Sequence, residues 1–187
     1  MPSCSAPAFG AKSGLHVPEV LQPALAPVVA VIAQLTAQIR AYDRLVEQLA
    51  SERYPETAQL RQVTGVGALT ALSFVLTLED PERFATSRAV GAYLGLCPRQ
   101  GDSGAMRPQL RITKSGDPLL RRLLVSAAHY ILGPFGPDCG LRRWGLALAA
   151  RGGKNGKKRA IVAVARRLAL RLRARWLEVL AAQKVAA

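Results

Sequence analysis

Apolar residues recur at alternating steps of three and four between residues 24 and 55, and this repeat constrains the fold more than any other feature. The alternation places its members on one narrow seam of a long helix. Two interpretations follow: an arm that packs on its own domain, or a coiled coil with another chain. The regularity favours the coiled coil, so we expect a homo-oligomer. The seam consists of Leu25, Val28, Ile32, Leu35, Ile39, Tyr42, Val46 and Leu49.

The rest of the chain also reads as helical. No stretch shows the sustained alternation typical of a half-buried β-strand, so the predicted fold class is all-α. The coiled-coil helix of residues 24–55 should precede a compact helical domain over residues 56–182. Residues 1–23 are rich in Pro, Ser, Gly and Ala, and we expect a disordered leader there.

Capping and breaking residues place the helices of the second part. Asp117-Pro118 should begin a helix that runs to Leu132, with Leu119, Leu120, Leu123 and Leu124 in its buried stripe. Asp80-Pro81 should cap a short helix, and Ser87 should cap the next. Two further helices are expected at residues 141–150 and 160–182.

Positive charge is confined to the second half of the chain. Residues 1–98 hold seven Lys and Arg against eight Asp and Glu, a net charge of −1, whereas residues 99–187 hold nineteen against four, a net charge of +15. This asymmetry indicates a polyanionic partner, nucleic acid before membrane. No apolar stretch looks long enough to span a bilayer. The three cysteines lack a pair spacing, which favours a reducing cytoplasm.

A Gly-x-Gly turn at Gly65 and Gly67 resembles a helix-hairpin-helix element. Leu60 and Val63 precede it, and Ala71 follows it, as in that motif. The glycines permit positive φ and a close backbone approach, and the next helix adds its N-terminal dipole, so a DNA phosphate could bind there. The alternative is a tight turn that binds nothing; the basic second half favours phosphate contact.

Cations surround one serine between residues 89 and 125. Ser103 lies in the Gly-rich turn Gly101-Asp102-Ser103-Gly104, a small nucleophile among positive charges. An inert turn is the alternative, because four turn-forming residues recur by chance. The surrounding cations are Arg99, Arg107, Arg111, Lys114, Arg121 and Arg122.

A second basic region begins at residue 151. Its glycine-rich loop contains Lys154, Lys157, Lys158 and Arg159. The last helix then carries arginines with almost no acids. Their positive charges repel one another, and this repulsion favours contact with DNA or RNA. These arginines are Arg166, Arg167, Arg171, Arg173 and Arg175.

The segments AYLGLCPRQGDSG and RITKSGDPLLRRLLV resemble the C-terminal transposase domain of the bacterial insertion-sequence family numbered one hundred and ten, which includes the Piv and MooV invertases. The resemblance covers roughly residues 58–175, with Thr113 where serine is common. It implies that Ser103 attacks a DNA phosphate and becomes covalently linked to it. It also implies that Arg99, Arg107, Arg111 and Lys114 could stabilise the transition state, and that a guide RNA is a further candidate partner.

The family's N-terminal RNase H-like domain supplies four acidic metal ligands, and nothing in residues 1–57 resembles it. We therefore expect no cofactor in this chain, Mg²⁺ only together with such a domain, and no activity of the chain alone. Two hypotheses remain open. The chain is part of a serine transposase that cleaves and rejoins DNA, or it is a non-catalytic helical module that binds DNA or RNA and dimerises.

Overall fold

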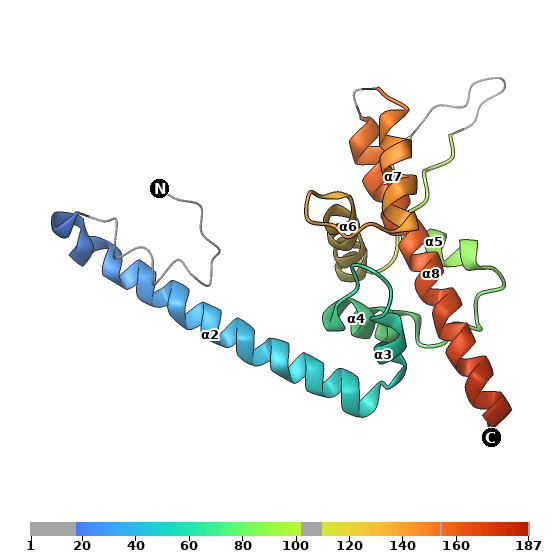
Figure 1. The fold of residues 1–187 in the computed structure, drawn as a ribbon, viewed down its shortest axis with the longest axis horizontal. Coiled ribbons are helices and arrows are strands. Elements are labelled where there is room, and N and C mark those ends of the chain that lie inside the picture. The colour runs from blue at the N-terminus through green and yellow to red at the C-terminus, as the bar shows by residue number, and fades with distance from the viewer. Residues whose placement is uncertain (1–17, 102–109, 154, 187) are drawn as a thin grey trace. The chain divides into compact units, whose positions relative to one another are not determined.

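The computed structural model describes residues 18–101, 110–153 and 155–186 (Figure 1). The chain divides into two units, Met1–Gln48 and Leu49–Ala187. The described elements are the 3₁₀ turn η1 (Glu19–Leu21) and the helices α2 (Gln22–Arg53), α3 (Glu56–Leu60), α4 (Ala68–Leu78), α5 (Ser87–Tyr93), α6 (Pro118–Leu132), α7 (Gly140–Ala150) and α8 (Gly156–Ala186). Within the described ranges there is no strand, so the all-α prediction is confirmed.

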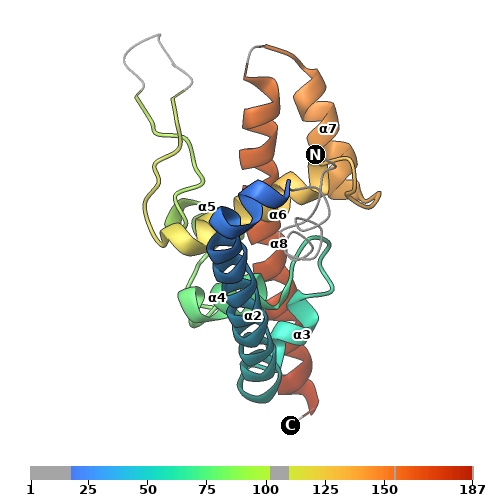
Figure 2. The same cartoon turned by 90° about the vertical axis from the view of Figure 1, so that its left-hand side faces the viewer.

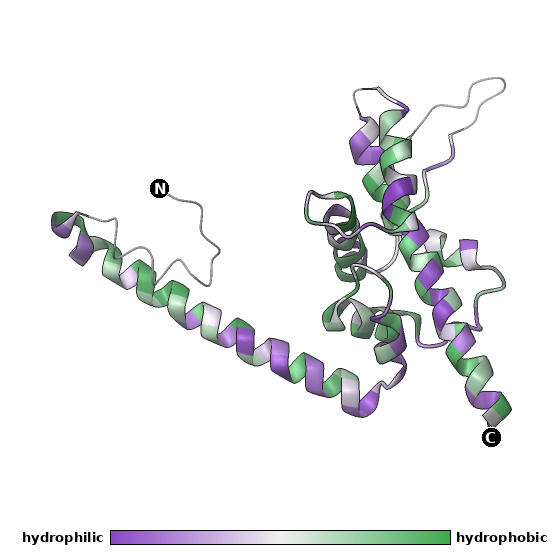
Figure 3. Ribbon diagram, viewed as in Figure 1, coloured by the Kyte–Doolittle hydropathy of each residue, from purple (hydrophilic) through white to green (hydrophobic). Residues whose placement is uncertain are grey.

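Helix α2 begins at Gln22, and most of it forms the described part of the first unit. The seam predicted from the sequence lies on this helix, and its residues are exposed or half-buried; Ile39 is 60% exposed and Tyr42 is 68% exposed. Figure 3 shows hydrophobic residues along most of the N-terminal half of the helix. The helix is confirmed, whereas its pairing with another chain stays a prediction. Residues 1–17 of the expected leader lie outside the described residues, and residues 19–23 are helical.

One expectation about this segment needs correction. Within Glu19–Arg53, an 18-residue window has a mean hydropathy of 1.7, and none of it is buried. By length and composition this helix could cross a membrane, contrary to the expectation that no stretch is long enough. A long helix with an apolar seam on one side, as predicted from the sequence, has the same length and composition.

Helix α8 is the centre of the second unit. It packs against α3, α5, α6 and α7, and α4 packs against α3 and α6. A small residue on α7 lets that helix approach α8 closely: a Cβ on Gly145 would lie 2.6 Å from the Val164 side chain. The buried face of α8 consists of Ala160, Val164, Ala165, Leu168, Ala169, Leu172 and Trp176, together with Arg173.

The predicted bounds of α6 are confirmed at both ends. Asp117 caps it, its side chain accepting a hydrogen bond from Leu120 N at 2.5 Å, and Pro118 occupies the first turn, where it has no hydrogen bond to lose. The stripe differs in part, because Leu119 is 46% exposed, Leu123 is half-buried, and the buried set continues to Ile131.

The prediction of a short helix after Asp80-Pro81 is wrong. Residues 81–86 form turns and bends, and α5 is preceded by Thr86 as its N-cap rather than by Ser87. The physical reason is a long-range contact. The guanidinium of Arg173 donates to Pro81 O at 2.9 Å and to Phe84 O, so these carbonyls serve a partner on α8 and not a helix of their own.

Candidate nucleic-acid interface

Two short segments before and after residues 102–109 pair antiparallel, and we call residues 95–101 and 110–114 the stalk. Arg99 N donates to Arg111 O at 2.9 Å, and Thr113 N donates to Cys97 O at 2.9 Å. Pro98 and Ile112 form an isolated β-bridge between them. The stalk therefore pairs the described segments immediately before and after residues 102–109. Ser103 and Arg107 themselves lie outside the described residues.

Two glycines fix the base of the stalk. Gly95 has φ +66°, and a Cβ there would overlap the backbone of Ser115. Gly116 has φ +73°, and a Cβ there would overlap the carbonyl of Tyr93. Both positions need the left-handed conformation and the absence of a side chain at once. The stalk is thus joined to the end of α5 by direct backbone packing.

The stalk carries three of the cations predicted from the sequence. Arg99, Arg111 and Lys114 are exposed, and none has a side-chain partner among the described residues. Lys114 has φ +60°, a left-handed conformation that costs a residue with a Cβ about 1–2 kcal/mol. Its backbone N–H donates to Gly95 O at 3.1 Å, which holds it in place.

Arg121 makes contacts within the fold, and the nucleic-acid contact predicted for it stays a prediction. Its Nη1 donates to Ser115 O at 2.7 Å and to Leu94 O at 3.2 Å, so it braces the base of the stalk. Its neighbour Arg122 is exposed on α6 and remains open to a partner.

The turn between α3 and α4 contains both glycines of the predicted hairpin motif. Gly65 has φ +84°, and a Cβ there would lie 2.9 Å from the Ile131 side chain, so packing on α6 alone explains this glycine. Gly67 is the exposed N-cap of α4, with no side-chain cap, and a Cβ there would meet no atom within 4 Å. Packing does not require a glycine at position 67, so the phosphate contact predicted for this turn stays a prediction.

The turn between α7 and α8 also carries predicted cations. Lys157 and Lys158 are exposed in the first turn of α8, and Arg151 is exposed at the end of α7. Arg159 is exposed too, but its Nη2 donates to Gly152 O at 3.3 Å and ties the turn to the helix. Lys154 lies outside the described residues.

Most arginines of α8 also make contacts within the fold, and the nucleic-acid face expected of them stays a prediction. Arg173 is 7% exposed, and Arg166 packs where a Cβ on Gly91 would meet it at 3.1 Å. Arg167 lies 4.5 Å from the centre of the Trp144 ring. Arg171 is the exposed exception without a described partner.

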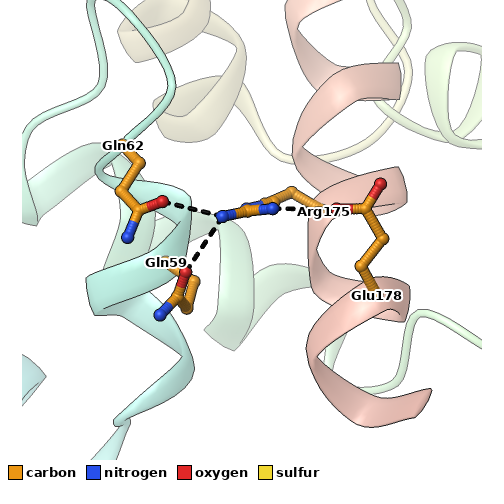
Figure 4. Close-up of polar contacts among 4 residues, drawn as sticks. All are labelled: Gln59, Gln62, Arg175 and Glu178. Atoms are coloured by element: carbon orange, nitrogen blue, oxygen red, sulfur yellow. Dashed lines mark hydrogen bonds and ion pairs between the residues drawn. The ribbon is translucent and has the colours of Figure 1, made fainter. Parts of the chain in front are cut away.

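Arg175 contacts three polar side chains, and two of them connect α8 to α3 and the residues that follow it (Figure 4). Its Nη2 donates to Gln62 Oε1 at 2.7 Å and to Gln59 Oε1 at 3.1 Å, while its Nη1 contacts Glu178 at 3.0 Å. Both terminal nitrogens of the guanidinium are thus used within the chain. Sequence reasoning missed this role because the two glutamines lie more than a hundred residues away.

Acidic metal ligands do not gather in the described part of the chain. Within residues 18–101, 110–153 and 155–186, no three His, Cys, Asp or Glu side chains lie close enough to hold an ion. These residues do not fit the magnesium site that the resemblance implies.

Comparison with known proteins adds to this geometry. Residues 57–137 match the family model described as "Transposase IS116/IS110/IS902 family". That range contains α3, α4, α5, the stalk and α6. This segment is related to insertion-sequence transposases.

Individual transposases match the same portion of the chain. The chain is 40% identical over 74 residues to the transposase for insertion sequence element IS1111A of Coxiella burnetii, covering 40% of this chain and 20% of that protein. It is 43% identical over 75 residues to the transposase for element IS1328 of Yersinia enterocolitica, covering 40% and 22%. It is 35% identical over 74 residues to a probable family 20 transposase of Pseudomonas aeruginosa, covering 40% and 22%. The matched region spans about a fifth of the length of these transposases.

Proposed function

We propose that the chain is the DNA-binding and serine-bearing portion of an insertion-sequence transposase, acting in DNA strand cleavage and rejoining in the bacterial cytoplasm. The observation that carries the proposal is the family match over residues 57–137, because it includes the stalk and the turn with Ser103. DNA is the proposed substrate, and a guide RNA is a further proposed partner.

In the proposed chemistry, the Ser103 hydroxyl attacks a DNA phosphate. A serine O–P bond forms, the P–O bond to the leaving strand breaks, the serine proton passes to a base, and the leaving oxygen gains a proton. Arg99, Arg111 and Lys114 on the stalk would stabilise the charge that develops on the phosphate oxygens. The base and any Mg²⁺ would come from a separate RNase H-like domain.

DNA binding by the full chain should depend strongly on salt. Exposed Lys and Arg that neutralise phosphates release counterions, so contact with about six phosphates should weaken binding by roughly 10³-fold between about 50 and 200 mM salt. Fluorescence anisotropy with labelled duplexes of unrelated sequence would measure this, and affinities should differ little between sequences. Binding that is insensitive to salt would contradict the electrostatic part of the proposal. The measurement uses the full chain and no shorter fragment of the second unit, because α3–α5 share one core with α6–α8.

A second candidate is a helical module that binds DNA or RNA and dimerises without chemistry of its own. The exposed seam of α2 favours the dimerising part of this candidate. The two candidates differ at Ser103, because only the first requires its hydroxyl.

We further propose that the α2 seam pairs with a second copy of the chain. Replacing Ile32 and Ile39 by Asp would place unpaired charges in that seam, so the oligomer should dissociate to monomers while α3–α8 stay folded. Light scattering measures the mass, and Gln34→Asp with Gln38→Asp, off the seam, is the matched control. A monomeric wild type would reject the pairing, as would a wild type that is recovered only in detergent.

A further inference from the structure

Two projections of the second unit each carry several exposed cations. One is the stalk, with Arg99, Arg111 and Lys114, and the other is the α7–α8 turn, with Arg151, Lys157 and Lys158. Figures 1 and 2, which differ by a quarter turn about the vertical axis, both show the stalk and this turn projecting at the same end of the unit. Two separate basic elements therefore face the same region of solvent.

The α7–α8 turn is held in place by its two helices. A Cβ on the buried Gly156 would lie 2.9 Å from Ala149 O, so the end of α7 and the start of α8 pack backbone to backbone. Gly156 N donates to Gly153 O at 2.9 Å, and Arg159 bonds Gly152 O. Lys157 and Lys158 are thus presented from a fixed helical turn, which lowers the entropic cost of binding a partner there.

No acid in the described part of the basic half compensates these lysines. Asp117 caps α6, Asp138 pairs with Arg143 at 2.9 Å, and Glu178 pairs with Arg175 at 3.0 Å. Residues 151–159 contain no acid at all. The turn therefore keeps uncompensated positive charge at a position where the fold does not need it.

The chemistry of both projections fits phosphates rather than bases. Proteins that hold single strands combine positive charge with aromatic side chains on which bases stack. Neither the described stalk nor residues 151–158 contains an aromatic residue. Two projections that carry exposed cations and no aromatic side chain instead suit the regular phosphate backbone of a duplex.

We propose that the α7–α8 turn is a second phosphate-binding element, which grips the backbone of the same DNA duplex that the stalk holds. The inference rests on the proposed DNA function and extends it to a part of the chain beyond residues 57–137. The stalk positions one phosphate region, and Lys157, Lys158 and Arg151 hold another.

The test compares the full-length wild type with a Lys157→Ala/Lys158→Ala variant on one random DNA duplex of about 30 base pairs. If both lysines contact phosphates, the slope of log affinity against log salt should fall by about 1.8, and affinity at low salt should fall by roughly 10-fold or more. Both side chains are exposed and lack described partners, so the circular dichroism of the variant should equal that of the wild type. Lys184→Ala is the matched control, because Lys184 lies near the other end of α8 in an exposed pair with Glu82 and should change the slope little.

The outcomes separate the inference from the function beneath it. A wild type that does not bind DNA overturns the proposed function. If the wild type binds and Arg99→Ala/Arg111→Ala weakens binding, an unchanged slope in the lysine variant overturns the inference alone. Equal effects of the lysine variant on a single strand of the same length would overturn the duplex assignment. Tighter binding of an RNA duplex, with the same sensitivity to the two lysines, would overturn the DNA assignment.

Discussion

Replacing Ser103 by Ala should abolish any covalent adduct between the protein and DNA. The serine oxygen is the atom that would bond to phosphorus, and the methyl group of an alanine side chain has no oxygen to replace it. The chain alone should not cleave DNA with Mg²⁺, so the assay supplies the RNase H-like domain of a related transposase. A labelled oligonucleotide that migrates with the protein on a denaturing gel reports the adduct. DNA affinity should be nearly unchanged in the variant, because one hydroxyl contributes little beside many cations.

Ser115→Ala is the control for this experiment. The Ser115 hydroxyl donates to Ala92 O at 3.3 Å and lies 3.1 Å from Thr113 Oγ1, so it already has a place at the base of the stalk. Its loss should leave the adduct in place. An adduct that survives Ser103→Ala would show that another residue is the nucleophile. Cleavage by the isolated wild-type chain would show that no second domain is needed.

Arg173→Leu should destabilise the second unit by about 3–5 kcal/mol, because it leaves one buried and two partly buried oxygen acceptors without a donor. Those acceptors are Pro81 O, Phe84 O and Ser87 Oγ, each of which accepts one hydrogen bond from the guanidinium. A loss of this size is a large part of the roughly 5–15 kcal/mol that stabilises an ordinary domain. Urea unfolding followed by circular dichroism measures the change in the free energy of unfolding.

Two further variants test the reason for this loss. Arg171→Leu removes the same charge from an exposed position on the same helix and should change the free energy of unfolding by less than about 0.5 kcal/mol. Arg173→Lys keeps the charge but cannot reach three acceptors from one planar group, so it should be intermediate. A loss in Arg173→Leu no larger than that of the Arg171 control would mean that the turn at residues 81–86 holds itself in place.

The helices of this chain could be predicted well where the sequence alone contains both the periodicity and the cap. Helix α6 is the clearest example: Asp117 and Pro118 mark its start, Leu132 precedes a glycine, and the structure has the same bounds. The spacing of apolar residues also predicted α2 and α8, since a repeat near 3.6 residues matches the period of an α-helix. Asp80-Pro81 has a similar start signal, yet no helix follows, because the acceptors of that turn bind a side chain from α8.

The candidate site was predictable only in part. The sequence by itself determined that positive charge gathers after residue 98 and that its cations flank a Gly-rich turn with Ser103. Only the tertiary structure decided which cations are available. Arg121 bonds Leu94 and Ser115, the buried Arg173 bonds the turn at residues 81–86, and Arg175 reaches α3, whereas Lys157 and Lys158 stay exposed. The physical reason is that an arginine's charge is a local property, but its hydrogen-bond acceptors come from residues far away in the chain.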